Sequence, residues 1–229
     1  MSLPIADRQI TTVRLIDDDA NVREGYRYSV DDLDLVPQEV ADPITDINQF
    51  AALFDRSHDA AICDFNLKAK NYSAFNGDEL VSRLYSMQIP ALLCTRWAGH
   101  LPDPVRYRRR QIPVVLPPGD LSPSSIRDAF ILCIDEFAGQ FSEARKPWRA
   151  MIRFEGGEPA GADDYRFNIV IPAWNPSVGL TFVVPRAGND VLKTIYGRLS
   201  SGEIARAFGQ VNLGAEKEED VYVDSWSLT

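Results

Sequence analysis

The sequence contains few of the residues that build the commoner metal and redox sites. Its 229 residues include two histidines and three cysteines. Neither His58 nor His100 lies near a pair of cysteines, so we do not expect a zinc site. Cys63, Cys94 and Cys133 are odd in number and widely spaced, which favours reduced, buried thiols in a cytoplasmic protein over a disulfide framework.

Long apolar runs and an excess of positive charge are also missing. Every apolar run falls well short of the roughly 20 residues that cross a bilayer. The first residues lack the basic segment followed by an apolar segment that marks a secretory signal. The formal net charge is −9, and an acidic chain is a poor default partner for nucleic acid or for an anionic membrane surface. We therefore expect no membrane partner, and we do not expect nucleic acid to be one.

Short apolar, β-branched runs alternate with helical patterns in the first part of the chain. The runs cover residues 13–16, 33–40, 60–63, 90–94 and 113–116. The helical patterns cover 22–30, 47–54, 77–87 and 122–141, with Asp19 or Asn21 as the N-cap of the first and Thr45 as the N-cap of the second. This alternation is typical of βαβ units and predicts a parallel sheet.

The character of the sequence changes after a polar, Pro-containing link at residues 143–148. Five later runs rich in Val, Ile, Phe, Tyr and Trp predict strands, at 149–154, 165–171, 179–185, 207–213 and 221–228. Two helices are expected among them, at 190–199 and 202–208. We predict an α/β domain over residues 1–144 and a smaller, β-rich (α+β) domain over 149–229.

Polar residues follow three of the early strands directly. Asp17, Asp18 and Asp19 follow the first run, Asp64 follows the run at 60–63, and Thr95 follows the run at 90–94. In an open parallel sheet, ligands bind beyond the carboxyl ends of the strands. Carboxylates gathered there are unfavourable unless a cation or a proton compensates them. Oxygen ligands of this kind suit a hard ion, so the sequence predicts a Mg²⁺ site.

Five short motifs occur in a fixed order across the first domain. They are Leu15-Ile16-Asp17-Asp18-Asp19, Cys63-Asp64-Phe65-Asn66-Leu67, Gly77-Asp78-Glu79-Leu80, Cys94-Thr95 and Val114-Val115-Leu116-Pro117. In this order and at this spacing they resemble the receiver domain of two-component response regulators. The resemblance implies a flavodoxin-like (βα)5 fold. It also implies a sensor histidine kinase or another phosphodonor as a partner.

The resemblance assigns a role to individual residues. Asp17 and Asp18 would hold Mg²⁺, directly or through water. Asp64 would be both the phosphate acceptor and a metal ligand. Asn66 would offer its backbone carbonyl to the metal, and Thr95 would hydrogen-bond the phosphoryl group. We expect no enzymatic activity beyond the protein's own phosphorylation by a donor.

The sequence departs from the receiver pattern at three places. Leu116 stands where the family has a lysine that pairs with the phosphoryl group, and Pro113 falls near the position of an aromatic switch residue. The loop from Asp64 to Gly77 is longer than in the family. Lys68 or Lys70 within this loop is a hypothetical replacement for the missing cation. The alternative interpretation is a pseudo-receiver that acts as a scaffold and is never phosphorylated.

Three hypotheses stand for the C-terminal domain. The first is a protein-interaction or homodimerisation module, with Trp174 and Trp226 either as anchors for the partner or as core residues. The second is DNA binding, because residues 199–209 resemble the start of a helix-turn-helix. The third is a PilZ-like sensor of cyclic-di-GMP. Arg145-x-x-x-Arg149 and Asn175-Pro-Ser-Val-Gly179 resemble the motifs of that family, although the family has one more residue between Ser and Gly, and paired arginines suit phosphate contacts. We favour the first, since neither a recognition helix nor a basic face is evident.

Overall fold

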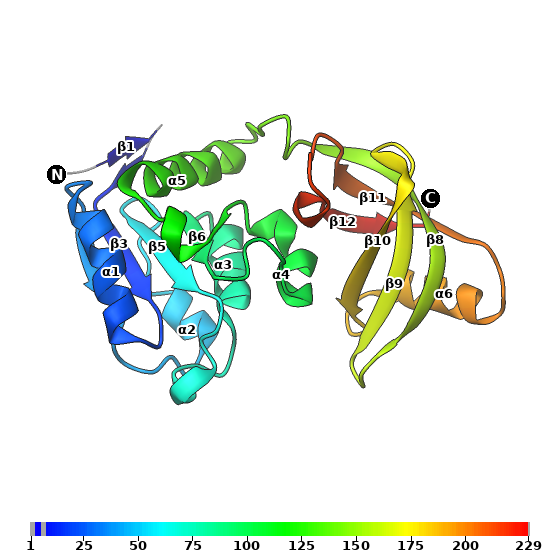
Figure 1. Ribbon diagram of the computed structural model, residues 1–229, viewed down its shortest axis with the longest axis horizontal. Helices are drawn as coiled ribbons and strands as arrows, with labels where there is room; N and C mark the ends of the chain where they lie inside the picture. Colours follow the sequence, from blue (N-terminus) through cyan, green and yellow to red (C-terminus); the bar gives the residue numbers. More distant parts are fainter. Residues whose placement is uncertain (1–2, 6–7, 229) are drawn as a thin grey trace. The chain divides into compact units, whose positions relative to one another are not determined.

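The computed structural model describes residues 3–5 and 8–228 and divides the chain into two compact units (Figure 1). The first unit contains Met1–His100 and Gln111–Gln140, and the second contains Leu101–Arg110 and Phe141–Thr229. The sequence places a single division between residues 144 and 149. The structure adds a second feature, because the segment 101–110 packs with the second unit although it lies inside the sequence of the first.

A five-stranded parallel sheet forms the centre of the first unit, as the sequence predicts. Its strands in spatial order are β4 (Val36–Glu39), β3 (Thr12–Ile16), β5 (Asp59–Asp64), β6 (Ala91–Cys94) and β7 (Val115–Leu116). If these strands are counted along the chain, the order is 2-1-3-4-5, which is that of the flavodoxin-like doubly wound fold. Such an order places the carboxyl ends of β3, β5 and β6 at one edge of the sheet.

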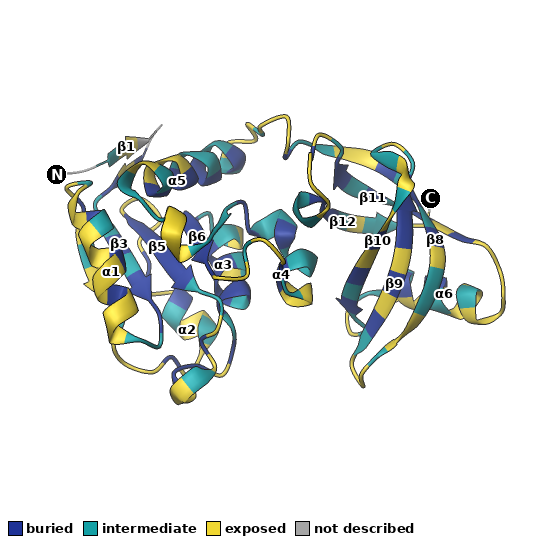
Figure 2. Ribbon diagram, viewed as in Figure 1, coloured by how far each residue is buried: buried dark blue, intermediate teal, exposed yellow. Residues whose placement is uncertain are grey.

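Helices cover this sheet and explain why β5 and β6 contain continuous apolar runs, whereas β4 is mostly exposed. The helices are α1 (Ala20–Asp31), α2 (Ile47–Ala51), α3 (Gly77–Ser86) and α5 (Pro123–Phe137). α1 contacts α5, whereas α2 contacts α3. Figure 2 shows the central strand β5 in dark blue, and residues 60–63 within it are 0% exposed. All three cysteines are buried thiols outside any disulfide, as predicted.

The helices begin at side-chain caps, one of which differs from the prediction. Asp19 caps α1 by accepting a hydrogen bond from the Asn21 amide, and Ser122 caps α5. The cap of α2 is Asp46, so the prediction of Thr45 was wrong. The Asp46 carboxylate accepts from two amides of the first turn, at 2.8 Å each. A carboxylate is favoured there because it also faces the positive end of the helix dipole.

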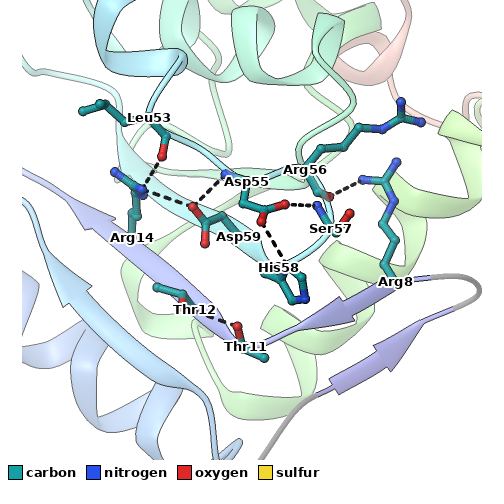
Figure 3. A network of polar contacts seen from close by, with 10 residues as sticks. All are labelled: Arg8, Thr11, Thr12, Arg14, Leu53, Asp55, Arg56, Ser57, His58 and Asp59. Atoms are coloured by element: carbon teal, nitrogen blue, oxygen red, sulfur yellow. Dashed lines mark hydrogen bonds and ion pairs between the residues drawn. The ribbon is translucent and has the colours of Figure 1, made fainter.

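An N-terminal hairpin that the sequence does not suggest precedes the parallel sheet. It pairs β1 (Leu3–Ile5) with β2 (Arg8–Ile10) in an antiparallel register. The Arg8 guanidinium donates to the carbonyl oxygens of Arg56 and Gln88. Nearby, Arg14 forms an ion pair with Asp59 at 3.1 Å (Figure 3). These charges are therefore used to join segments far apart in the sequence around the start of β5.

The second unit is built on a five-stranded antiparallel sheet. Its spatial order is β10 (Asn175–Pro185), β9 (Asp164–Ile171), β8 (Pro147–Ala160), β11 (Ala205–Asn212) and β12 (Val223–Ser227). Helix α6 (Asp190–Ser200) packs against it, as predicted. The expected helix at 202–208 is wrong, because Gly202 adopts a positive φ of 74° and residues 205–208 belong to β11. The hypothetical helix-turn-helix is therefore lost.

The segment 101–110 is a component of the second unit. It carries the short helix α4 (Asp103–Tyr107), which packs on β10. The Arg109 guanidinium forms an ion pair with Asp220 at 2.7 Å. Arg145 donates to the carbonyl oxygens of Arg109 at 3.3 Å and of Arg110 at 2.9 Å. The segment is thus held by charge-assisted hydrogen bonds as well as by apolar packing.

Two tryptophans that the sequence offered as anchors or as core residues pack against the core of the second unit. Trp174 also donates its indole N–H to the Ala215 carbonyl oxygen at 2.7 Å. Trp226 lies 5.9 Å from the Phe154 ring, measured between centroids. In the described part of the chain, no helix is both long and apolar enough to cross a membrane.

Candidate functional site

The carboxyl ends of β3, β5 and β6 border a hollow of about 400 Å³, here called the acidic hollow. Five residues that the sequence predicts as site residues line it, namely Asp17, Asp18, Asp64, Asn66 and Thr95. The strand order of the sheet explains this convergence, because β3 pairs with β5 and β5 pairs with β6. The structure therefore brings together every predicted site residue.

Asp17 is the most enclosed carboxylate, with 3% of its surface exposed. One oxygen accepts from the Asp19 amide at 2.8 Å, and the other accepts from the Tyr26 hydroxyl at 3.3 Å. Burial raises the pKa of Asp17 to about 6, although the Asp19 hydrogen bond opposes the rise and the charges of Asp64 and Asp18 add to it. The hollow thus holds more negative charge than its own hydrogen bonds compensate.

Asp64 lies at the end of β5 and is half-buried. Its Oδ2 accepts a hydrogen bond from the Asn66 amide at 2.7 Å. Burial raises the pKa of Asp64, and hydrogen bonds from the backbone of Asn66 and Phe65 act against this. The nearby charge of Asp18 raises that pKa further, whereas the charge of Arg96 lowers it. A hydrogen bond within its own turn therefore orients the Asp64 carboxylate, and the charges of Asp18 and Arg96 shift its pKa in opposite directions.

Gly77 begins α3 and touches the backbone of Asp64. A Cβ at this position would lie 1.8 Å from the Asp64 carbonyl oxygen and 2.9 Å from the Cys63 sulfur. Only glycine lets the helix approach the end of β5 so closely. The spacing between the two motifs therefore has a packing reason, since it brings α3 against the strand that presents Asp64.

Thr95 is 2% exposed and lies at the end of β6. Its amide donates to the Leu116 carbonyl oxygen at 2.8 Å, and its hydroxyl accepts from the Trp97 amide at 3.3 Å. Leu116 packs against the core of the first unit and is not among the residues that line the acidic hollow. A leucine at the end of β7 thus contributes packing where the receiver pattern has a cation.

Lys70 supplies a cation from the long loop between β5 and α3. Its ammonium nitrogen lies 3.2 Å from Asp19 Oδ2 and 3.5 Å from Asp18 Oδ2. Lys68 points elsewhere, with its nitrogen 3.9 Å from Glu79 Oε1. Of the two lysines in the sequence hypothesis, only Lys70 contacts the aspartates that follow β3. Asp19 is consequently more than a helix cap.

Sequence reasoning missed three further polar or aromatic residues that line the acidic hollow, namely Tyr26, Arg96 and Trp97; Val22 and Pro118 also line it. Arg96 and Trp97 directly follow Thr95, so their place after a strand end was a usable signal. Tyr26 is 4% exposed and belongs to the apolar stripe of α1, where its hydroxyl happens to reach Asp17. The helical period alone marks it as a core residue.

The donor set of the acidic hollow suits a hydrated ion better than a fully protein-bound one. Among the described residues, no three His, Cys, Asp or Glu groups are arranged so that they could hold a metal ion. Mg²⁺ usually keeps several waters and takes only one or two carboxylates. Asp18 and Asp64 line one hollow, and both oxygens of Asp17 already accept hydrogen bonds. These residues fit Mg²⁺ with Asp17 acting through water.

Comparisons with known proteins identify neighbours by structure alone. No protein-family model and no curated protein sequence matches the chain. A response regulator receiver domain protein from Clostridium thermocellum matches with 9% identity and a TM-score of 0.43, covering 56% of this chain and 98% of its own. A sensor protein from Polaromonas sp. JS666 matches with 12% identity and a TM-score of 0.41, covering 55% of this chain and 97% of its own.

The response regulator StyR is a further structural neighbour. It matches with 22% identity and a TM-score of 0.41 over 57% of this chain. The match covers 62% of StyR, so this chain spans less than two thirds of that protein's length. These three neighbours match 55–57% of this chain at low sequence identity, and they do not identify the second unit.

Proposed function

We propose that this protein is a response regulator in which Asp64 accepts a phosphoryl group in the presence of Mg²⁺. The convergence of Asp17, Asp18, Asp64 and Thr95 in one hollow carries this proposal. The donor would be a sensor histidine kinase or a small phosphate ester or anhydride. The bond from an Asp64 oxygen to phosphorus forms as the bond from phosphorus to the donor breaks.

The residues around Asp64 support this chemistry. The Asn66 amide donates to one oxygen of the Asp64 carboxylate and so orients it, and partial burial reduces its screening by bulk water. Bound Mg²⁺ would neutralise charge between two anions that must meet. Asp18 and Asp64 would hold the ion, with Asp17 acting through water. The Thr95 hydroxyl borders the same hollow and would donate to a phosphoryl oxygen.

For the second unit we propose a protein-interaction role. The loss of the expected helix at 202–208 removes the motif that suggested DNA binding. The Arg145 guanidinium, which suggested a phosphate contact, is used within the unit to hold the segment 101–110. Exposed apolar side chains remain, including Trp148 at 48% and Ile204 at 77%. Such side chains are candidates for contact with a partner protein or a second copy of the chain.

Incubation with acetyl phosphate tests the proposal. With Mg²⁺, the intact mass should rise by one phosphoryl group, and it should not rise when the metal is chelated. The Asp64→Asn variant should remain unmodified, and Asp18→Asn should react more slowly. Asp128→Asn, at an exposed position of α5, is the matched control and should react like the wild type. A wild type without Mg²⁺-dependent modification would favour the pseudo-receiver interpretation, which the leucine at 116 supports.

A further inference from the structure

Lys70 is the lysine whose nitrogen contacts the aspartates at the end of β3. It bridges Asp18 Oδ2 at 3.5 Å and Asp19 Oδ2 at 3.2 Å. Asp18 and Asp19 line the acidic hollow together with Asp64. One flexible four-carbon side chain therefore places its charge on two aspartates that share a hollow with the acceptor.

The loop that carries Lys70 is anchored on both sides. Leu67 is 0% exposed and Tyr72 is 5% exposed, so both ends of the loop tip are buried. The Tyr72 hydroxyl donates to the Val40 carbonyl oxygen at 2.7 Å, and its carbonyl oxygen accepts from the Ile44 amide at 2.7 Å. The segments on both sides of Lys70 are thus anchored, and this determines the position of the Lys70 backbone.

The backbone at this tip adopts an unfavourable conformation. Lys70 has a φ of 53° and Asn71 a φ of 58°, and neither is glycine. A left-handed conformation costs roughly 1–2 kcal/mol for a residue such as Lys70, whereas the short polar side chain of Asn71 tolerates it better. Strain of this kind persists only where surrounding structure enforces it, and it clusters at functional sites. Here the turn aims Lys70 at the aspartates.

Two other cations of the region have different surroundings. Lys68 lies in the same loop, but its nitrogen is 3.9 Å from Glu79 at the start of α3. Arg96 lines the acidic hollow, and its guanidinium lies 5.8 Å from the centre of the Trp97 ring. Lys70 differs from both because it already bridges two aspartates next to the acceptor.

We propose that Lys70 is the phosphoryl-binding lysine of this site. While Asp64 is unmodified, its ammonium group neutralises Asp18 and Asp19 and competes there with divalent cations. When Asp64 carries a phosphoryl group, the ammonium group turns to a phosphoryl oxygen and forms a charge-assisted hydrogen bond. This role rests on the proposed function, because it presupposes that Asp64 binds a phosphoryl group.

Calorimetric titration of the full chain tests this role with two ligands. The first is Mg²⁺ alone, and the second is beryllofluoride at saturating Mg²⁺, as a mimic of the bound phosphoryl group. Lys70→Met should bind Mg²⁺ about three- to fivefold more tightly, because an exposed competing charge is removed. It should bind beryllofluoride roughly tenfold more weakly, because one charge-assisted hydrogen bond is lost. A purely structural role would not move the two affinities in opposite directions.

The control variants separate this role from the alternatives. Lys68→Met removes the same charge from the same loop and should leave both affinities unchanged. Lys70→Arg keeps the charge and should recover most of the beryllofluoride affinity. Equal affinities in Lys70→Met and wild type would overturn the role of Lys70 while leaving the proposed function intact. A tenfold loss in Arg96→Met alone would assign the contact to Arg96. A wild type that binds no beryllofluoride would overturn the proposed function and this role together.

Discussion

Replacing Asp17 with asparagine removes a charge that the folded protein accommodates poorly. The carboxyl is 3% exposed, and its pKa rises from the ordinary value of 3.8 to about 6. The folded state therefore holds this proton more tightly than the unfolded chain. Stability is unaffected by Asp17 below pH 3.8, falls as the pH rises towards 6, and carries the full penalty above that.

The size of this penalty follows from the same two values. The interval from 3.8 to about 6, at about 1.36 kcal/mol for each pH unit, corresponds to roughly 3 kcal/mol at pH 7.5. Asparagine keeps one oxygen acceptor but loses the other, which costs about 1 kcal/mol. The net stabilisation is then about 2 kcal/mol at pH 7.5. At pH 4.5 the penalty of the charge is only about 1 kcal/mol, so the two effects cancel.

Thermal melting of the wild type and the Asp17→Asn variant at both pH values measures this difference. At roughly 2–4 °C for each kcal/mol, the variant should melt about 4–8 °C higher at pH 7.5 and nearly together with the wild type at pH 4.5. Asp128→Asn, on an exposed face of α5, should change neither midpoint appreciably. A variant that melts lower at pH 7.5, or one raised equally at both pH values, would refute the reasoning.

Three further predictions concern the acidic hollow and the second unit. Mg²⁺ should raise the melting temperature of the wild type at pH 7.5, and Asp18→Asn should reduce that rise; an undiminished rise in the variant would place the ion elsewhere. Gly77→Ala should destabilise the protein by roughly 1–3 kcal/mol in denaturant melts, because its Cβ would meet the Asp64 carbonyl oxygen at 1.8 Å. Unchanged stability would contradict that contact. Asp220→Ala should cost about 1 kcal/mol, because it removes an ion-pair partner that is itself 43% exposed from the buried Arg109 side chain. High salt should screen the ion pair and so narrow the stability difference between the wild type and the variant, whereas a salt-independent difference would contradict the electrostatic origin.

The sequence was sufficient to predict the parallel sheet and most of the polar residues that line the acidic hollow. Short apolar runs that end in Asp17, Asp64 and Thr95 carry both signals, because parallel strands place their carboxyl ends at one edge. The position of Lys70 was only a hypothesis, since it depends on two left-handed residues that no local pattern announces. Such a conformation is set by the anchored loop and not by the propensity of lysine or asparagine.

Two errors have tertiary causes. Residues 205–208 have moderate helix propensity, but pairing of β11 with β8 and β12 determines their conformation. The sequence also gave no indication that Val105, which is 0% exposed, packs with the second unit. The apolar character of Val105 predicts that this residue is buried, but it does not predict which of the two units buries it. The N-terminal hairpin was missed because Arg8 is held by carbonyls far away in the chain.

The segment 101–110 has a consequence for synthesis on the ribosome. It emerges before the strand β10 (Asn175–Pro185) on which it packs has been made. At about 5–20 residues per second, the segment waits on the order of 4–15 s for that strand. During this time Val105 and Leu101, which end 0% and 6% exposed, have no completed core to enter. Since the second unit is assembled from two separated stretches, a gene fusion that transfers only residues 141–229 to another protein would carry an incomplete fold.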